Sequence, residues 1–150
     1  MREAIRLSHQ NIKEGKGGPF AAVVVKGNTI IARGTNLVTS TNDPTAHAEI
    51  VAIREACRIL GSFQLTDCDV FTTCEPCPMC MGAIYWARPN NVYYANTRED
   101  AAAIGFDDQI LYAELAAPLS QRRIPMIQIV RDEALEAFRE WERKKDRIPY

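Results

Sequence analysis

The residue pattern that most constrains this chain is a His-x-Glu motif at His47 and Glu49, followed thirty residues after the histidine by Cys77 and Cys80. One imidazole and two thiolates form a donor set that suits Zn²⁺. Because three protein ligands leave a fourth coordination position open, the pattern is typical of a catalytic rather than a structural site. The Glu49 carboxylate is placed to move protons to and from a water molecule at that position.

The spacing of His47 and Glu49 restricts where they lie in a helix. Residues at i and i+2 point about 200° apart on a regular helix, so both reach one site only from a helix end. The preceding residues 43–45, Asp-Pro-Thr, supply capping side chains and a proline suited to a first turn. An apolar stripe over residues 50–60 then continues at helical spacing and ends before Gly61.

The two cysteines also indicate a helix start. Cys77 and Cys80 are three residues apart, so they share one helix face, and Pro76 and Pro78 fit only at the beginning of a helix. The sequence therefore predicts two helix N-termini that meet at one metal ion. Their free N–H groups and positive dipole ends favour thiolates.

Composition limits the class of protein. The chain has 150 residues, of which 47% are apolar and 25% charged, as expected for one globular domain. The net charge of −1 gives little electrostatic help for binding a long nucleic acid, and no apolar run is long enough to span a membrane. Five cysteines, an odd number, favour a reducing compartment, so we expect a cytoplasmic protein without a disulfide framework.

Periodicity predicts an α/β fold. An initial hairpin turns at Gly27-Asn28, and later strands alternate with helices, which indicates a mixed five-stranded sheet with helices on both faces. The predicted strands cover residues 20–26, 29–33, 69–73, 91–95 and 126–130. The predicted helices, besides the two at the metal site, cover residues 1–14, 99–104, 109–114 and 132–145.

Other interpretations of the cysteines stay open from the residues alone. Cys74 extends the motif to C-x₂-C-x₂-C, which could hold an iron–sulfur cluster, but the fourth cysteine of such a run is replaced by Ile84. A structural zinc bound by His47 and all three cysteines would leave Glu49 without a role. We therefore interpret Cys74 as a packed thiol, and keep a structural zinc module that binds a partner protein as the non-enzymatic alternative.

Several further residues have two interpretations on spacing alone. Asn36 is equally a turn residue or a substrate ligand. Polar loop or core positions that could instead contact a substrate are Asp107, Asp108, Phe20 and Trp86.

With the segments 44–49 (Pro-Thr-Ala-His-Ala-Glu) and 74–80 (Cys-Glu-Pro-Cys-Pro-Met-Cys) in view, the chain resembles the cytidine deaminase-like superfamily, and more closely the small bacterial guanine deaminases. The zinc motifs alone identify only the superfamily, because tRNA adenosine deaminases share the first segment. The resemblance runs nearly end to end, through residues 17–20, 35–36, 82–89 and 105–108, and Tyr150. The Gly-Phe-Asp-Asp segment at 105–108 and the tail ending in tyrosine separate guanine deaminases from the tRNA enzymes.

The resemblance implies a role for each matching residue. His47, Cys77 and Cys80 would bind one Zn²⁺ per subunit, with water or hydroxide as the fourth ligand, and Glu49 would be the proton shuttle. Asp107 and Asp108 would be further catalytic groups that read the guanine edge or assist a second proton transfer. The substrate-binding residues would be Asn36, Phe20, Ala48, Trp86, Asp108 and Tyr150.

The implied fold is the three-layer α/β/α fold of the superfamily, and the implied reaction is hydrolytic deamination of guanine to xanthine and ammonia through hydroxide attack at C2. A guanosine or other nucleoside deaminase and a tRNA adenosine deaminase are the alternatives. The expected partners are a small purine base and a second copy of the chain, with no membrane and no nucleic acid. In this dimer the C-terminal helix and tail, about residues 131–150, would be exchanged between subunits, and Tyr150 would close the partner's site.

Overall fold

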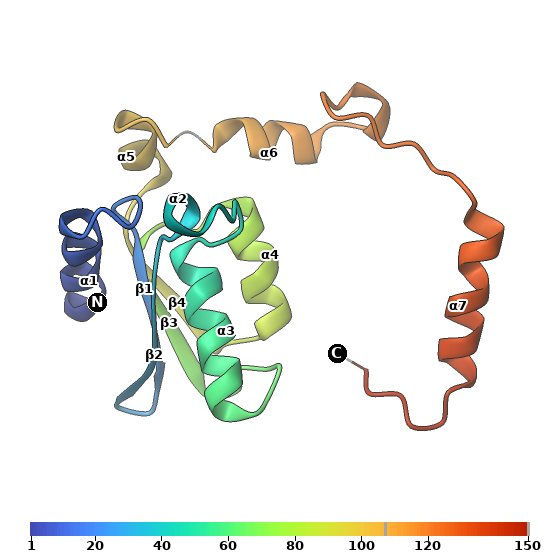
Figure 1. The fold of residues 1–150 in the computed structure, drawn as a ribbon, viewed down its shortest axis with the longest axis horizontal. Helices are drawn as coiled ribbons and strands as arrows, with labels where there is room; N and C mark the ends of the chain where they lie inside the picture. The colour runs from blue at the N-terminus through green and yellow to red at the C-terminus, as the bar shows by residue number, and fades with distance from the viewer. Residues whose placement is uncertain (107, 150) are drawn as a thin grey trace. The chain divides into compact units, whose positions relative to one another are not determined.

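A computed structural model describes residues 1–106 and 108–149 (Figure 1). The chain forms two compact units, Met1–Asp108 and Gln109–Tyr150. The first unit contains the sheet and both metal-motif segments.

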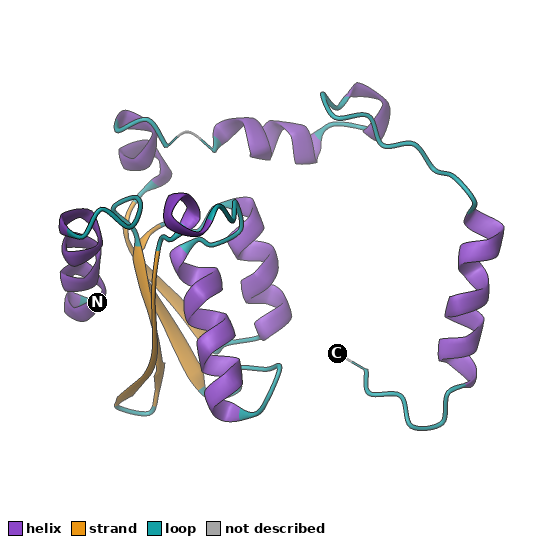
Figure 2. Cartoon of the chain, viewed as in Figure 1, coloured by secondary structure: helices purple, strands orange, loops and turns teal. Residues whose placement is uncertain are grey.

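The first unit is built on a four-stranded mixed sheet (Figure 2). Its strands are β1 (Ala21–Lys26), β2 (Thr29–Thr35), β3 (Cys68–Cys74) and β4 (Asn91–Asn96), in the spatial order β2-β1-β3-β4. β1 pairs antiparallel with both β2 and β3, whereas β3 and β4 are parallel. The predicted hairpin is confirmed: Lys26 pairs with Thr29 across a turn in which Gly27 has φ +57°.

Helices cover both faces of this sheet. Helix α1 (Arg2–Lys13) lies on one face, and α3 (Ala48–Leu60) and α4 (Pro78–Ala87) lie on the other (Figure 1). Residues 21–24 of β1 are all buried, which requires cover on both sides because successive side chains of a strand point to opposite faces. The predicted three-layer α/β/α arrangement is confirmed.

Two short helices complete the described part of the first unit, and helices make up most of the second unit. The sequence did not predict α2 (Val38–Thr41), while α5 (Arg98–Ala103) begins with a capping box made by Thr97 and Asp100. The second unit contains α6 (Gln109–Ala116), a 3₁₀ turn at Leu119–Gln121 and α7 (Arg131–Arg143). Among the described residues, no helix combines the length and apolar character needed to cross a bilayer.

The prediction of a fifth strand at residues 126–130 is wrong. This segment forms no strand and pairs with no other described segment, so the sheet has four strands among the described residues. Its apolar side chains are exposed, with Ile127 at 80% and Ile129 at 75%. A strand needs a neighbour for its N–H and C=O groups, and β-propensity mainly reports how well side chains pack on a sheet. An apolar β-branched pattern therefore gives no strand where no neighbour is available.

Gly34 lets α3 approach β2 closely enough to fix the metal motif. A Cβ atom at Gly34 would lie 2.2 Å from the Ala48 carbonyl oxygen and 2.5 Å from the Ala52 nitrogen. Both atoms belong to the backbone of α3, so neither moves without moving the helix. The packing of the sheet thus determines where the N-terminus of α3, with His47 and Glu49, lies.

We expect Gly34→Ala to lower the free energy of unfolding by about 1–3 kcal/mol, the usual cost of overpacking a core. The matched control is Gly82→Ala, because Gly82 lies within helix α4 and a Cβ there meets no atom within 4 Å. Alanine at that helical position should stabilise the protein by up to about 1 kcal/mol. Urea denaturation of both zinc-loaded variants measures the two changes. An equal stability for the two would contradict the close-approach argument.

Candidate metal centre

The three predicted ligands meet in the structure. Atoms of His47, Cys77 and Cys80 lie within 4.8 Å of one another, and Nδ1 of the histidine is 3.6 Å from each Sγ atom. A tetrahedral zinc ion about 2.0 Å from nitrogen and about 2.3 Å from sulfur would separate those two atoms by about 3.5 Å, close to the observed distance. The donor set therefore fits Zn²⁺ in both chemistry and spacing.

Two helix N-termini carry these ligands, as predicted. His47 is the N-cap of α3 and Cys77 is the N-cap of α4, and both have extended backbone, with ψ 155° and 167°. Because the backbone at His47 is extended and not helical, its side chain does not have to point about 200° away from that of Glu49, the second residue of the helix. The helix starts later than the capping signals predicted, because Asp43 bonds to the N–H and hydroxyl of Thr45 at 2.8 and 2.7 Å and so closes a turn instead.

Glu49 lies beside the ligand group and is 6% exposed. Its Oε1 accepts a hydrogen bond from the Thr72 hydroxyl at 3.2 Å, and its Oε2 accepts one from the Cys80 thiol at 3.5 Å. Burial raises the pKa of the Glu49 carboxyl above its ordinary value. A carboxylate with a raised pKa, held by one oxygen and directed to the ligand group by the other, is suited to accept and return a proton.

The pKa values of the two cysteine ligands are shifted in opposite directions. A hydrogen bond from Cys80, with a further contribution from His47, lowers the pKa of the Cys77 thiol to about 4. The hydrogen bond to Cys77 and burial both raise the pKa of Cys80, and the same thiolate raises that of His47. Because zinc binds thiolates, metal binding would release the thiol proton of Cys80.

Cys74 does not belong to the ligand group. It ends β3, is buried, and its thiol donates to the Thr97 carbonyl at 3.5 Å. Burial is the main cause that raises its pKa to about 11, so the thiol stays protonated. This geometry favours the three-ligand catalytic interpretation over a structural zinc with one histidine and three cysteines, and over an iron–sulfur cluster.

Asn36, Phe20 and Asp108 lie in the same unit as the metal ligands. Asn36 follows β2, and its Oδ1 accepts the Val38 N–H at 3.3 Å. The N–H of Asn36 donates to the Phe20 carbonyl at 3.0 Å, which ties the two segments together. Cys77 is the main cause of the raised pKa of His47, and the negative charge of Asp108 adds to it.

For the remaining residues that were predicted to contact the substrate, the structure gives less support. Ala48 is fully buried and belongs to the hydrophobic core, so its methyl group packs against neighbouring side chains. Trp86 is 62% exposed and lies six residues beyond Cys80, about 9 Å further along the axis of α4. Asp107 and Tyr150 fall outside the described residues.

Two residues near the site were missed by the sequence analysis. Phe106 packs its ring edge-on against Phe20, with centroids 4.8 Å apart and planes at 89°. Thr72, which holds Glu49, lies two residues before Cys74 on β3. Thr72 could have been found from the sequence, because side chains two residues apart on a strand point to the same face and Thr72 lies two residues before Cys74.

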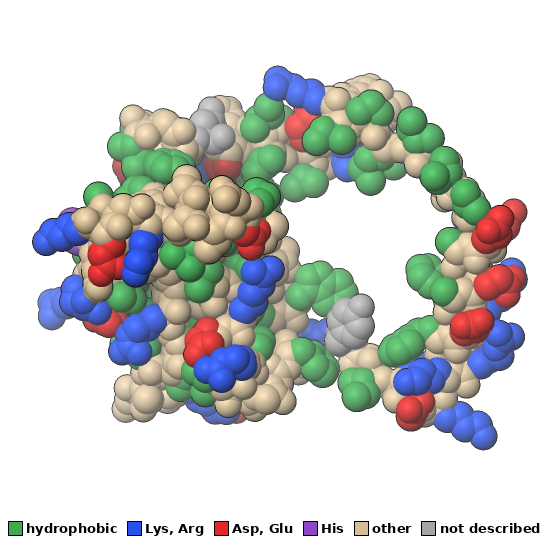
Figure 3. All heavy atoms as spheres, viewed as in Figure 1, with side chains coloured by type: hydrophobic (Ala, Val, Ile, Leu, Met, Phe, Trp, Pro, Cys, Tyr) green, Lys and Arg blue, Asp and Glu red, His purple; other side chains and the backbone are tan. Residues whose placement is uncertain are grey.

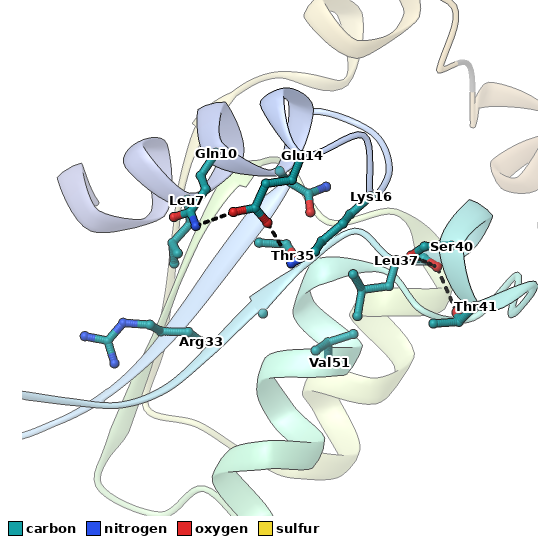
Figure 4. A pocket seen from close by; sticks show the side chains of 12 residues that line it. Leu7, Gln10, Glu14, Lys16, Arg33, Thr35, Leu37, Ser40, Thr41 and Val51 are labelled. Atoms are coloured by element: carbon teal, nitrogen blue, oxygen red, sulfur yellow. Dashed lines mark hydrogen bonds and ion pairs between the residues drawn. The ribbon is translucent and has the colours of Figure 1, made fainter.

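A separate pocket lies between α1, β2, α2 and α3 (Figure 4). None of the predicted site residues lines it, and the charged and amide groups of residues 10, 14 and 16 in its wall bond to one another. Gln10 donates to Glu14 at 2.6 Å, and Lys16 pairs with the same carboxylate at 2.6 Å. The pocket therefore offers few free polar groups to a ligand, in contrast to the metal centre.

Comparison with known proteins decides the family. Residues 1–96 match the family described as the cytidine and deoxycytidylate deaminase zinc-binding region. The chain belongs to this deaminase family. The matched segment includes all three candidate ligands and Glu49, so the family's zinc-binding region coincides with the ligand group found in the structure.

Within this family, the chain is similar over nearly its whole length to guanine deaminases. The chain is 52% identical to guanine deaminase of Bacillus subtilis over 141 residues, which cover 94% of this chain and 90% of the relative. A crystal structure of guanine deaminase from B. subtilis matches with a TM-score of 0.97 and 50% identity, over 99% of this chain and 95% of that one. A structure of guanine deaminase from Nitrosomonas europaea matches with a TM-score of 0.68 and 33% identity, over 92% and 80%.

We expect Cys77→Ala to abolish stoichiometric zinc binding, because two ligands do not hold the metal against dilution. Cys74→Ala is the matched control, since it removes a neighbouring buried thiol that lies outside the ligand group. Metal analysis by mass spectrometry after gel filtration should give no zinc for the first variant and one zinc for the second. Loss of zinc from Cys74→Ala would contradict the three-ligand assignment.

Proposed function

We propose that the protein is a zinc-dependent guanine deaminase, which hydrolyses guanine to xanthine and ammonia. The observation on which this conclusion depends is the buried Glu49 carboxylate beside a His47–Cys77–Cys80 group, in a chain that is 52% identical to a guanine deaminase over 94% of its length. A structural zinc module is disfavoured, because it would need neither an open coordination position nor a carboxylate with a raised pKa beside it.

In the proposed mechanism, three side chains bind the metal ion and Glu49 transfers protons. His47, Cys77 and Cys80 would bind the zinc ion, which when present activates a water molecule at neutral pH. Glu49 accepts the proton of that water at Oε2, while Thr72 keeps the other carboxylate oxygen in place. Glu49 returns this proton to the purine ring nitrogen as the oxygen adds to C2. It then takes the proton of the new C2 hydroxyl and delivers it to the amino group, and the C2–N bond breaks to release ammonia.

Recognition of guanine is assigned to three residues of the first unit. Asn36 has its Oδ1 occupied by the Val38 N–H, and no described residue accepts a hydrogen bond from its Nδ2, which is left to donate to a purine. Guanine presents adjacent N–H donors, which a carboxylate such as that of Asp108 accepts. The ring of Phe20 offers an apolar surface for the flat base.

The near-neutral charge supports a free base over a tRNA substrate. A protein that binds a phosphate backbone gains affinity from clustered Lys and Arg, and this chain has 18 basic against 19 acidic residues.

The five free cysteines of the chain support a reducing, cytoplasmic location.

The second unit supports a homodimer with an exchanged C-terminal segment. Phe138 of α7 is 73% exposed, and the unpaired segment 126–130 exposes a row of apolar side chains; Figure 3 shows hydrophobic side chains at the surface of this unit. In the first unit, β4 is an edge strand, and its Tyr93 and Tyr94 are exposed. Apolar surface on this scale and an open strand edge are features that proteins normally bury. We infer that the C-terminal helix and tail of one subunit, about residues 131–150, cover the β4 side of a second subunit, with Tyr150 closing its site.

The direct test of function is ammonia release from guanine, guanosine, adenine, adenosine, cytosine and cytidine by the zinc-loaded protein. We expect the protein to turn over guanine faster than the other five compounds.

The variant Glu49→Gln should still fold and bind zinc but lose activity by a factor of about 10²–10⁴, the usual effect of removing an acid–base group. Glu55→Gln, on the exposed side of the same helix, is the control. Full activity of Glu49→Gln would refute the mechanism, and preference for guanosine would change the substrate.

The exchange of the tail is tested by complementation. A chain lacking residues 146–150 and a full-length Glu49→Gln chain should each be poorly active alone. If the tail closes the partner's site, co-expression with two different tags produces a mixed dimer in which one intact Glu49 meets one intact tail. The purified mixed dimer should then regain part of the activity. A mixed dimer as inactive as its parents would indicate that each tail serves its own subunit.

A further inference from the structure

We propose that Asn11 of α1 is a positioning residue that holds the candidate substrate-binding residues Asn36 and Phe20 in place. Asn11 lies on the helix that covers the opposite face of the sheet from α3 and α4, and it has no place in the metal centre (Figure 1). The inference rests on the proposed function, because it assigns Asn36 and Phe20 to purine binding.

The amide of Asn11 connects two segments that are distant in sequence. Its Nδ2 donates to the carbonyl of Gly18 and to the carbonyl of Asn36, both at 2.9 Å. Gly18 lies just before β1, and Asn36 lies just after β2. The same two segments are joined again by the hydrogen bond from the Asn36 N–H to the Phe20 carbonyl. One side chain of α1 therefore fixes the backbone on both sides of the proposed purine site.

The remaining atom of this amide shows that packing alone does not explain the residue. Asn11 is 2% exposed, and its Oδ1 finds no hydrogen-bond partner among the described residues. A buried acceptor without a partner costs about 1–3 kcal/mol, so an apolar side chain would be the better choice if only packing mattered. Among uncharged side chains, only Asn and Gln supply two donors from one nitrogen. The two carbonyls that Asn11 holds are the compensating gain.

The position of Asn36 is tightly restricted by this arrangement. A Cβ atom on Gly17 would lie 2.3 Å from the Asn36 carbonyl oxygen and 2.8 Å from the Asn36 Oδ1. The backbone at Gly17 therefore packs directly against Asn36. Asn11 holds the carbonyl of Asn36, and Val38 holds the Oδ1. Together these contacts leave the Nδ2 of Asn36 in one orientation, as a donor to a bound purine requires.

Loss of the Asn11 amide should affect substrate binding more than the chemical step. The zinc ligands and Glu49 lie at the starts of α3 and α4, and Asn11 makes no hydrogen bond to either helix. The freed segments carry Asn36 and Phe20, whose contacts with the base would be made equally in the bound and reacting states. Removal of such uniform binding raises KM and leaves kcat nearly unchanged.

The experiment compares Asn11→Ala with Ser8→Ala in guanine deamination. Ser8 is the matched control, because it is a buried polar residue of the same helix whose hydroxyl bonds only to the Ile5 carbonyl within that helix. For Asn11→Ala we expect KM to rise by a factor of about 10–10², the scale of small misplacements near a site, with kcat within a few-fold and zinc content unchanged. Ser8→Ala should match the natural sequence.

A double-mutant cycle with Asn36→Ala separates positioning from general stability. If Asn11 acts mainly through Asn36, its replacement should raise KM far less when Asn36 is already alanine. Fully additive effects, or an Asn11→Ala variant kinetically equal to Ser8→Ala, would overturn the proposal. Should Asn11→Ala fail to fold with zinc, Gly17→Ala leaves α1 intact and should raise KM by displacing Asn36; an unchanged KM there would equally overturn it.

Failure of this inference is distinguishable from failure of the proposed function. The unsubstituted protein in the same assay reports whether guanine is the substrate. If it turns over a different base, the same cycle on that base still tests Asn11, because the hydrogen bonds to Gly18 and Asn36 do not depend on which purine or pyrimidine binds.

Discussion

The structure depends on the convergence of two helix N-termini on one three-ligand group. Because His47 precedes the first turn of α3 and Cys77 precedes that of α4, both ligands leave extended backbone and reach a common point. The free N–H groups of both helices favour the negative charge that two thiolates bring. The close contact of β2 with α3 at Gly34 fixes where α3 begins, and the Thr72 hydroxyl holds the Glu49 carboxylate beside the ligand group.

Much of this arrangement follows from sequence because the relevant signals are local. The i, i+2 spacing of His47 and Glu49 required a helix end, and prolines 76 and 78 marked the second one. The hairpin was equally local, since Gly27 supplies the positive φ that its turn needs. The exact start of α3 was missed because Asp43 has two possible uses, as a helix cap or as the acceptor that closes a turn, and only the tertiary structure selects the second.

The features that sequence did not reveal are those that depend on distant partners. Residues 126–130 have the composition of a strand, but a strand exists only beside another one, and no described part of this chain provides it. The role of Asn11 is likewise invisible in sequence, because its two acceptors lie seven and twenty-five residues away. The exposed apolar side chains of the second unit are the observation on which the proposed dimer rests, and a partner subunit likewise leaves no local signal in one sequence.

The measurement that tests the account most directly is zinc X-ray absorption spectroscopy of the loaded protein. The account predicts two sulfur neighbours at about 2.3 Å and two nitrogen or oxygen neighbours at about 2.0–2.1 Å, as expected for His47, Cys77, Cys80 and one exchangeable water. Three sulfur neighbours would mean that Cys74 is also a ligand. The site would then be closed and structural, and the proposed role of Glu49 in hydrolysis would be contradicted.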